Sequence, residues 1–224
     1  MTFPKATIVF DLDGTLVDTA PDLLASLNAV LARGGYTPIV PDQLRHLVGH
    51  GVRTLFERAF EESTTAIAPE RLDALGAEFL DHYRGHIAVG SRPFQGVPET
   101  LELLGRGGHG LGVCTNKPQD LTELLLAELD LARHFPAVHG LGRMPYNKPD
   151  PRHVLDVVEA LKGDRSRAVM IGDSPVDVAA AKAAGIPVIA MSYGYTPIPV
   201  GELGADVVAH DFAELPRLIS DLLD

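Results

Sequence analysis

The 224-residue sequence predicts an α/β fold: a doubly wound, Rossmann-like parallel sheet core with an all-helical cap inserted after the first strand. Two observations predict the sheet. Short apolar runs rich in β-branched residues recur along the chain, and segments with helical periodicity separate them. A third observation predicts the insertion, because the sequence shows no convincing strand between about residues 18 and 93. We therefore expect a core of residues 1–17 and 94–224 and a helical cap of residues 18–93.

The apolar runs locate the central strands. The first run, ATIVF at residues 6–10, lies between Pro4 and Asp11, which is typical of a buried strand. Similar runs predict strands at residues 111–115, 168–172 and 188–191. Strands that alternate with helices form parallel sheets through crossover connections. Their carboxyl ends should meet along one edge, where α/β proteins bind ligands.

Start and stop signals locate the helices. Thr19, Pro21 and Asp22 predict an N-cap, an early proline and a capping-box acid for a helix that stops at Gly34-Gly35. Helical periodicity predicts three more helices in the insertion, near residues 42–48, 52–62 and 69–87. A second capping box, formed by Ser174 and Asp177, begins a later helix, and a final helix is expected near residues 212–223.

Composition excludes several classes of protein. With 46% hydrophobic residues, the chain can bury a substantial core, which argues against disorder. The net charge of −11 and the lack of a basic block argue against nucleic acids and anionic membranes as partners. The single cysteine, Cys114, cannot form an intrachain disulfide, and the first ten residues lack the layout of a signal peptide. We expect a cytoplasmic protein, either a monomer or a homodimer.

Two acids follow the first strand directly. If the chain stays extended from Asp11 to Asp13, their side chains lie on the same face, because strand side chains alternate with period two. At about 4 Å and an effective dielectric near 20, two carboxylates repel by roughly 4 kcal/mol. The pair must therefore share a proton or bind a cation, and an oxygen-only site suits Mg²⁺. The alternative for Asp-x-Asp alone is that the two acids cap turns.

Polar residues also follow the later strands. Thr115 and Asn116 precede a helix and are typical of a phosphate cradle, although either can be a simple N-cap. Lys148, in a proline-flanked loop, can hold a phosphate as a point charge or be solvated. Asp173 follows another strand, and Asp177 is three residues beyond the Ser174 cap. Together these residues place acids, a hydroxyl and a cation at one edge of a parallel sheet, which indicates a phosphate-handling site.

These residues make the sequence resemble the haloacid dehalogenase-like hydrolase superfamily. The four motifs that carry the resemblance are Asp11-x-Asp13-x-Thr15, Thr115, Lys148 and Gly172-Asp173-Ser174-x-x-Asp177. Within the superfamily the chain is most similar to bacterial phosphoglycolate phosphatases, through residues 11–19, 48–51, 58–59, 115–118 and 193–195. It departs from their pattern at three places: residues 140–143 lack the usual Gly-Gly-Asp, Asp150 replaces a frequent His, and Val176 replaces a common Asn.

The resemblance implies a role for each site residue. Asp11 is the expected nucleophile, which forms an aspartyl-phosphate, and Asp13 the expected acid and then base. The expected Mg²⁺ ligands are Asp11, the backbone carbonyl of Asp13, and Asp173. Asp177 is expected to orient Lys148 or to support the metal shell. Phosphate or substrate contacts are expected from Gly14, Thr115, Asn116, Lys148, Arg53 and Arg58, with His50 a further candidate for a substrate carboxylate.

The implied activity is a Mg²⁺-dependent phosphatase of small phosphate esters, with 2-phosphoglycolate as the favoured substrate. Pyrophosphate or a sugar phosphate is the nearest alternative. A phosphomutase would use the same residues but return the phosphoryl group to its substrate. A receiver-like phospho-aspartate signalling module also combines strand-end acids, a Thr and a Lys, but the long helical insertion argues against it.

Overall fold

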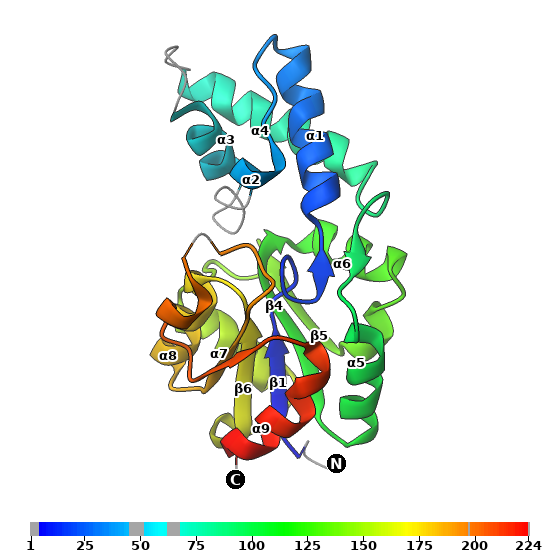
Figure 1. Ribbon diagram of the computed structural model, residues 1–224, viewed down its shortest axis with the longest axis vertical. Helices are drawn as coiled ribbons and strands as arrows, with labels where there is room; N and C mark the ends of the chain where they lie inside the picture. The colour runs from blue at the N-terminus through cyan, green and yellow to red at the C-terminus, as the bar shows by residue number, and fades with distance from the viewer. Residues whose placement is uncertain (1–4, 45–51, 62–67, 197, 224) are drawn as a thin grey trace.

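The computed structural model describes residues 5–44, 52–61, 68–196 and 198–223, without the side chains of residues 42, 52, 53, 58 and 61. Six strands form a parallel sheet in the order β5-β4-β1-β6-β7-β8 (Figure 1). Their bounds are β1 Thr7–Phe10, β4 Gly110–Pro118, β5 Ala137–Leu141, β6 Ala168–Gly172, β7 Val188–Met191 and β8 Val207–Ala209. The predicted α/β class and all four predicted strands are confirmed, while β5 and β8 were not predicted.

Helices cover both faces of the sheet. In β1, Ile8 and Phe10 belong to one buried core cluster and Val9 to the other, as the alternation of strand side chains requires. The first cluster includes apolar residues of α5 (Val97–Arg106), α6 (Gln119–Glu128) and α9 (Leu215–Leu223). The second includes residues of α7 (Pro151–Ala160) and α8 (Pro175–Ala184). β1 is therefore buried on both faces, so that the acids after it start from a fixed position.

The insertion is helical in its described part. Between β2 (Val17–Asp18) and β3 (Arg92–Pro93), the residues that the structure describes form four helices and no strand. These helices are α1 (Ala20–Arg33), α2 (Pro41–Leu44), α3 (Val52–Glu61) and α4 (Pro69–Arg84). Figure 1 shows them gathered beyond the carboxyl ends of the strands. Nowhere in the described ranges is a helix both long and apolar enough to cross a membrane.

A two-residue antiparallel ribbon, which was not predicted, closes the base of the insertion. In it, Val17 pairs with Pro93 and Asp18 with Arg92. Each strand is too short to leave a periodic pattern in the sequence. The ribbon pairs the segment that enters the insertion with the segment that leaves it, so the two ends of the insertion lie side by side.

The start of α1 corrects one prediction. Thr19 makes no side-chain capping bond. Asp22 instead accepts hydrogen bonds from the N–H of Gly90 at 2.7 Å and from the N–H and hydroxyl of Ser91 at 2.7 and 2.6 Å. The N–H groups of Thr19 and the next residue donate to the Tyr195 hydroxyl at 2.7 and 2.9 Å. The predicted capping box is therefore wrong, because Asp22 binds Gly90 and Ser91 instead, and Tyr195 accepts the Thr19 N–H in its place.

Candidate active site

Three buried acids meet at the carboxyl edge of the sheet. Asp11 follows β1, Asp173 follows β6, and Asp177 lies in the first turn of α8. Each offers a carboxylate oxygen, and these oxygens lie within 4.8 Å of one another. The structure therefore brings together acids that are more than 160 residues apart in the sequence.

Lys148 lies against two of these acids. It comes from the loop between β5 and α7, and it is only 2% exposed. Its Nζ lies 2.8 Å from Oδ1 of Asp11 and 2.6 Å from Oδ1 of Asp177. Burial opposes the charge of Lys148, but the two carboxylates outweigh it and raise the lysine pKa. Lys148 is therefore a fixed cation rather than a solvated loop residue.

Asp177 uses both carboxylate oxygens within the protein. Oδ1 takes the bond from Lys148, and Oδ2 accepts hydrogen bonds from the Ser174 N–H at 3.0 Å, the Ser174 hydroxyl at 2.5 Å and the Asp173 N–H at 3.2 Å. The predicted capping box of Ser174 and Asp177 is confirmed. Asp177 is therefore placed to hold Lys148.

Asp173 sits in a slot between two loops. Its Oδ1 accepts a hydrogen bond from the Thr15 hydroxyl at 2.7 Å, and its Oδ2 accepts one from the Tyr195 N–H at 2.7 Å. A Cβ on Gly194 would lie 2.2 Å from the Asp173 Cβ, and a Cβ on Gly14 would lie 2.5 Å from Oδ2. Gly14 also has φ +83°, a conformation that side chains other than glycine rarely adopt. Gly14 therefore positions Asp173.

The electrostatics of this cluster suit a divalent cation. Burial and the charge of Asp177 raise the pKa of Asp11 to about 7, although Lys148 opposes them. Burial, followed by Asp177 and Asp11, raises the pKa of Asp173 well above its usual range. Burial is the largest cause of both shifts, so the charged forms of Asp11 and Asp173 are unfavourable here without a further cation. Carboxylate oxygens are the donors that Mg²⁺ prefers, so Asp11 and Asp173 fit a Mg²⁺ site.

Thr115 and Asn116 lie beside the acids, on β4. Thr115 is 1% exposed, and its hydroxyl accepts a hydrogen bond from the Lys117 N–H at 3.2 Å. The side-chain amide of Asn116 donates to the backbone carbonyl of Lys148 at 3.0 Å. Asn116 therefore holds the Lys148 loop. The strand also runs on to Pro118, beyond the end predicted at Thr115.

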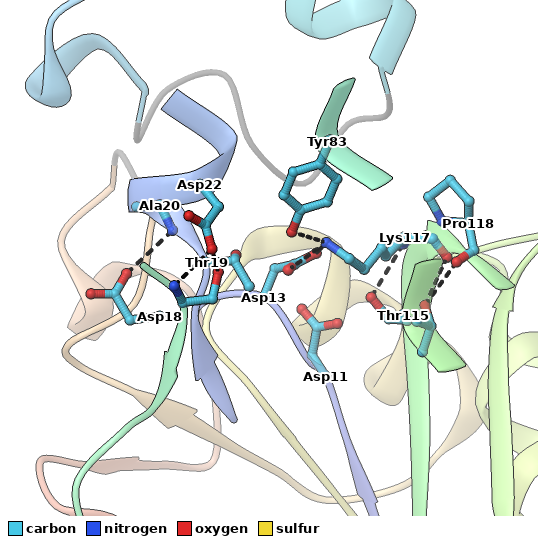
Figure 2. Close-up of polar contacts among 12 residues, drawn as sticks. Asp11, Asp13, Asp18, Thr19, Ala20, Asp22, Tyr83, Thr115, Lys117 and Pro118 are labelled. Carbon is cyan, nitrogen blue, oxygen red and sulfur yellow. Dashed lines mark hydrogen bonds and ion pairs between the residues drawn. The ribbon is translucent and has the colours of Figure 1, made fainter. Parts of the chain in front are cut away.

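Asp13 faces a residue to which the sequence assigned no role. Its Oδ1 lies 3.0 Å from Nζ of Lys117, which also donates a hydrogen bond to the Tyr83 hydroxyl at 2.8 Å. Figure 2 shows Lys117 reaching from β4 between Asp13 and Tyr83, with Tyr83 descending from α4. Period-two alternation is the signal that could have found it, since Thr115 and Lys117 share a face of one strand.

Three predicted substrate contacts cannot be placed. His50 and the side chains of Arg53 and Arg58 lie outside the described residues. For these three, the sequence resemblance remains the only argument.

Comparison with known proteins agrees with this geometry. A family model described as haloacid dehalogenase-like hydrolase matches residues 8–191. The chain belongs to the haloacid dehalogenase-like hydrolases. This membership supports a hydrolase over a receiver-like module, as the long helical insertion predicted.

Individual relatives of this hydrolase match along almost its whole length. A phosphoglycolate phosphatase of Caulobacter vibrioides is 48% identical over 218 residues, 97% of this chain and 92% of the relative. An N-acetylmuramic acid 6-phosphate phosphatase of Pseudomonas aeruginosa is 36% identical over 219 residues, 97% and 94% of the two chains. The crystal structure of a predicted phosphoglycolate phosphatase from Haemophilus somnus has a TM-score of 0.90 at 29% identity, covering 97% and 99%. The protein is therefore a phosphatase of this family.

Proposed function

We propose that this phosphatase hydrolyses 2-phosphoglycolate to glycolate and phosphate through a phosphoryl group carried on Asp11. The observation that carries the proposal is the Asp11 carboxylate at the end of β1, held 2.8 Å from the buried ammonium of Lys148. A carboxylate in this position can attack phosphorus, and a fixed cation beside it offsets the charge of the incoming phosphate.

In the first step an oxygen of Asp11 forms a bond to phosphorus while the bond from phosphorus to the ester oxygen breaks. Asp13 gives a proton to that ester oxygen, so that glycolate leaves as the alcohol. In the second step Asp13 takes a proton from water, whose oxygen attacks phosphorus and releases Asp11. Two easier steps thus replace one difficult displacement.

The surrounding residues position the phosphoryl group. Lys148 and Thr115 stabilise charge on its oxygens, while Asp177 holds Lys148 and Asn116 holds its loop. Asp11, Asp173 and the backbone carbonyl of Asp13 would hold Mg²⁺, which when bound supplies positive charge between the nucleophile and the phosphate. Phosphoryl transfer requires mainly positioning and charge stabilisation, so this small set of groups is sufficient.

The helices of residues 18–93 would act as a cap over this site and exclude water while Asp11 is phosphorylated. Their place beyond the carboxyl ends of the strands supports that role (Figure 1). We also propose a cytoplasmic location, as the single cysteine and the first ten residues suggest.

The substrate proposal rests on the relatives' names and on the sequence motifs. A sugar phosphate is the second candidate, because the Pseudomonas aeruginosa relative is named for one. A panel of phosphate esters with phosphate release as the readout tests both, and it should contain 2-phosphoglycolate, pyrophosphate and N-acetylmuramic acid 6-phosphate. Turnover should be highest with 2-phosphoglycolate. A higher kcat/KM for another ester would reject this substrate, and an isomerised phosphate with little free phosphate would indicate a mutase.

A further inference from the structure

Lys117 is a buried cation that the proposed hydrolysis does not use. The residue is 6% exposed, and its Nζ lies 3.0 and 3.4 Å from the two carboxylate oxygens of Asp13 and 2.8 Å from the Tyr83 hydroxyl. Burying an ammonium costs several kcal/mol, and even a buried ion pair is often no more stable than well-packed apolar side chains. An apolar side chain could join β4 to α4 without that cost. The charge therefore suggests a ligand that needs it.

We propose that Lys117 and Tyr83 bind an anionic group on the alcohol part of the substrate, and so select phosphate esters with a carboxylate close to the ester oxygen. The inference rests on the proposed function, which places the ester oxygen beside Asp13. It deepens that function by naming the residues that recognise the leaving group.

The distances limit where such a group can lie. Lys117 Nζ is 3.0 Å from Oδ1 of Asp13, and Asp13 would hydrogen-bond the ester oxygen at about 2.7 Å. The ammonium is then within about 6 Å of the ester oxygen. A carboxylate attached one carbon from the ester oxygen spans that gap with one further hydrogen bond of about 2.8 Å. An anionic group much farther from the ester oxygen could not hydrogen-bond to Lys117.

Tyr83 contributes a second donor. Its hydroxyl accepts the hydrogen bond from Lys117, and within the described part of the chain its proton has no hydrogen-bond acceptor. Burial, opposed by Lys117, raises the pKa of Tyr83 to about 12, so the proton stays on the oxygen at neutral pH. The Lys117 Nζ also lies 4.5 Å from the centre of the Tyr83 ring. An anion at this place would meet an ammonium and a phenol together.

The two partners of the ion pair between Lys117 and Asp13 differ in exposure. The Lys117 side chain is 2% exposed and that of Asp13 15%, so Asp13 is the more accessible partner. Both carboxylate oxygens of Asp13 now face Lys117. To protonate the ester oxygen, Asp13 must turn one oxygen toward it. The substrate carboxylate can then take the place that this oxygen leaves at Lys117.

The test compares two esters of similar size, one with a carboxylate and one with an uncharged alcohol in its place. In 2-hydroxyethyl phosphate, a CH₂OH group replaces the carboxylate of 2-phosphoglycolate. We expect the wild-type enzyme to prefer 2-phosphoglycolate by at least about 10-fold in kcat/KM. K117M should reduce this preference by about 10- to 100-fold, which is the range for losing a hydrogen bond to a charged group. Y83F should reduce it less, and K182M, which removes an exposed ammonium on α8, should not reduce it.

Equal fold losses on both esters in K117M would overturn the inference, because Lys117 would then act through Asp13 alone. A wild-type enzyme that hydrolyses esters without distinguishing the carboxylate would overturn it too. Circular dichroism checks the fold of each variant, and the wild-type and Y83F comparisons remain decisive if K117M does not fold. A wild-type enzyme that hydrolyses no phosphate ester would reject the proposed function itself. If the enzyme prefers another ester, the same comparison uses that ester and an analogue that lacks its anionic group.

Discussion

Asp177 and Lys148 form an ion pair of 2.6 Å in which neither side chain reaches solvent. The pair joins the first turn of α8 to the loop after β5 and fixes Lys148 beside Asp11. Breaking a buried ion pair usually costs more than breaking an exposed one, because the remaining charge stays out of water. This relationship yields the first prediction.

D177N should lower the free energy of unfolding by about 3 kcal/mol or more, because Lys148 keeps only Asp11 as a charged partner. Urea unfolding measures the change. The matched control is D221N, which breaks the exposed pair of Arg217 and Asp221 and should cost less than about 1 kcal/mol. Equal losses in the two variants would show that burial of the Asp177 pair contributes nothing.

D11N should reduce kcat by about 10⁴-fold or more, because the amide cannot serve as the nucleophile. Without divalent cations, the free energy of unfolding of D11N should change much less than its activity does. The reason is that one of three mutually repelling buried acids loses its charge. Phosphate release and urea unfolding measure the two effects. A folded D11N enzyme with near wild-type turnover would contradict the assignment of Asp11.

Chelation by EDTA should abolish activity, and added Mg²⁺ should restore it. Mg²⁺ should also raise the melting temperature of the wild-type protein, since a ligand at 100 times its Kd adds about 2.7 kcal/mol to stability. D173N should lose most of this increase, because Asp173 is one of the proposed ligands of the ion. Thermal unfolding with and without Mg²⁺ provides the test, with D206N on the surface as control. The same increase in D173N as in the wild type would exclude Asp173 as a ligand.

His153 should make the free energy of unfolding fall below pH 6.5, against an opposite effect of Asp11, whose raised pKa lets the folded chain take up a proton below about pH 7. This histidine is fully buried, and burial, aided by the charge of Lys148, lowers its pKa from 6.5 to about 4. In this pH range the unfolded chain binds a proton that the folded chain does not. The contribution of His153 to the free energy of unfolding is therefore complete above pH 6.5, where it is about 3 kcal/mol. It is lost as the pH falls toward 4.

Urea unfolding between pH 4 and pH 7 checks this prediction. Relative to the wild type, H153Q should lose less stability, or gain more, as the pH falls, whereas H210Q, at an exposed position, should keep the wild-type dependence. An unchanged slope in H153Q would assign the effect to other groups.

The sequence predicted the acid cluster well because its members follow apolar strands. Asp11 and Asp173 come directly after β1 and β6, and the parallel topology that alternating helices impose brings such positions together. Lys148 was predicted from its proline-flanked loop before a helix, although a loop lysine is ordinarily solvated. Its burial depends on Asp11 and Asp177, which lie far away in the sequence.

Interactions without a local pattern were missed. Lys117 bonds to Asp13, 104 residues away, and to Tyr83, 34 residues away, and neither spacing repeats a helix or strand period. The capping box at Thr19 had the right residues, yet Tyr195 and Ser91 supplied the partners. The unpredicted strand β5 contains a His and a Gly, which weaken the β signal.

The close packing around Asp173 leaves no room for a side chain at two positions in the loops beside it. Gly14 lies in the loop after β1 and Gly194 in the loop after β7, so main chain rather than side chains forms the walls of the slot. Either glycine, if replaced even by alanine, would push the carboxylate or spread the loops apart. The orientation of this acid is thus set by two positions that contribute no chemical group of their own, and a search confined to reactive side chains would overlook them.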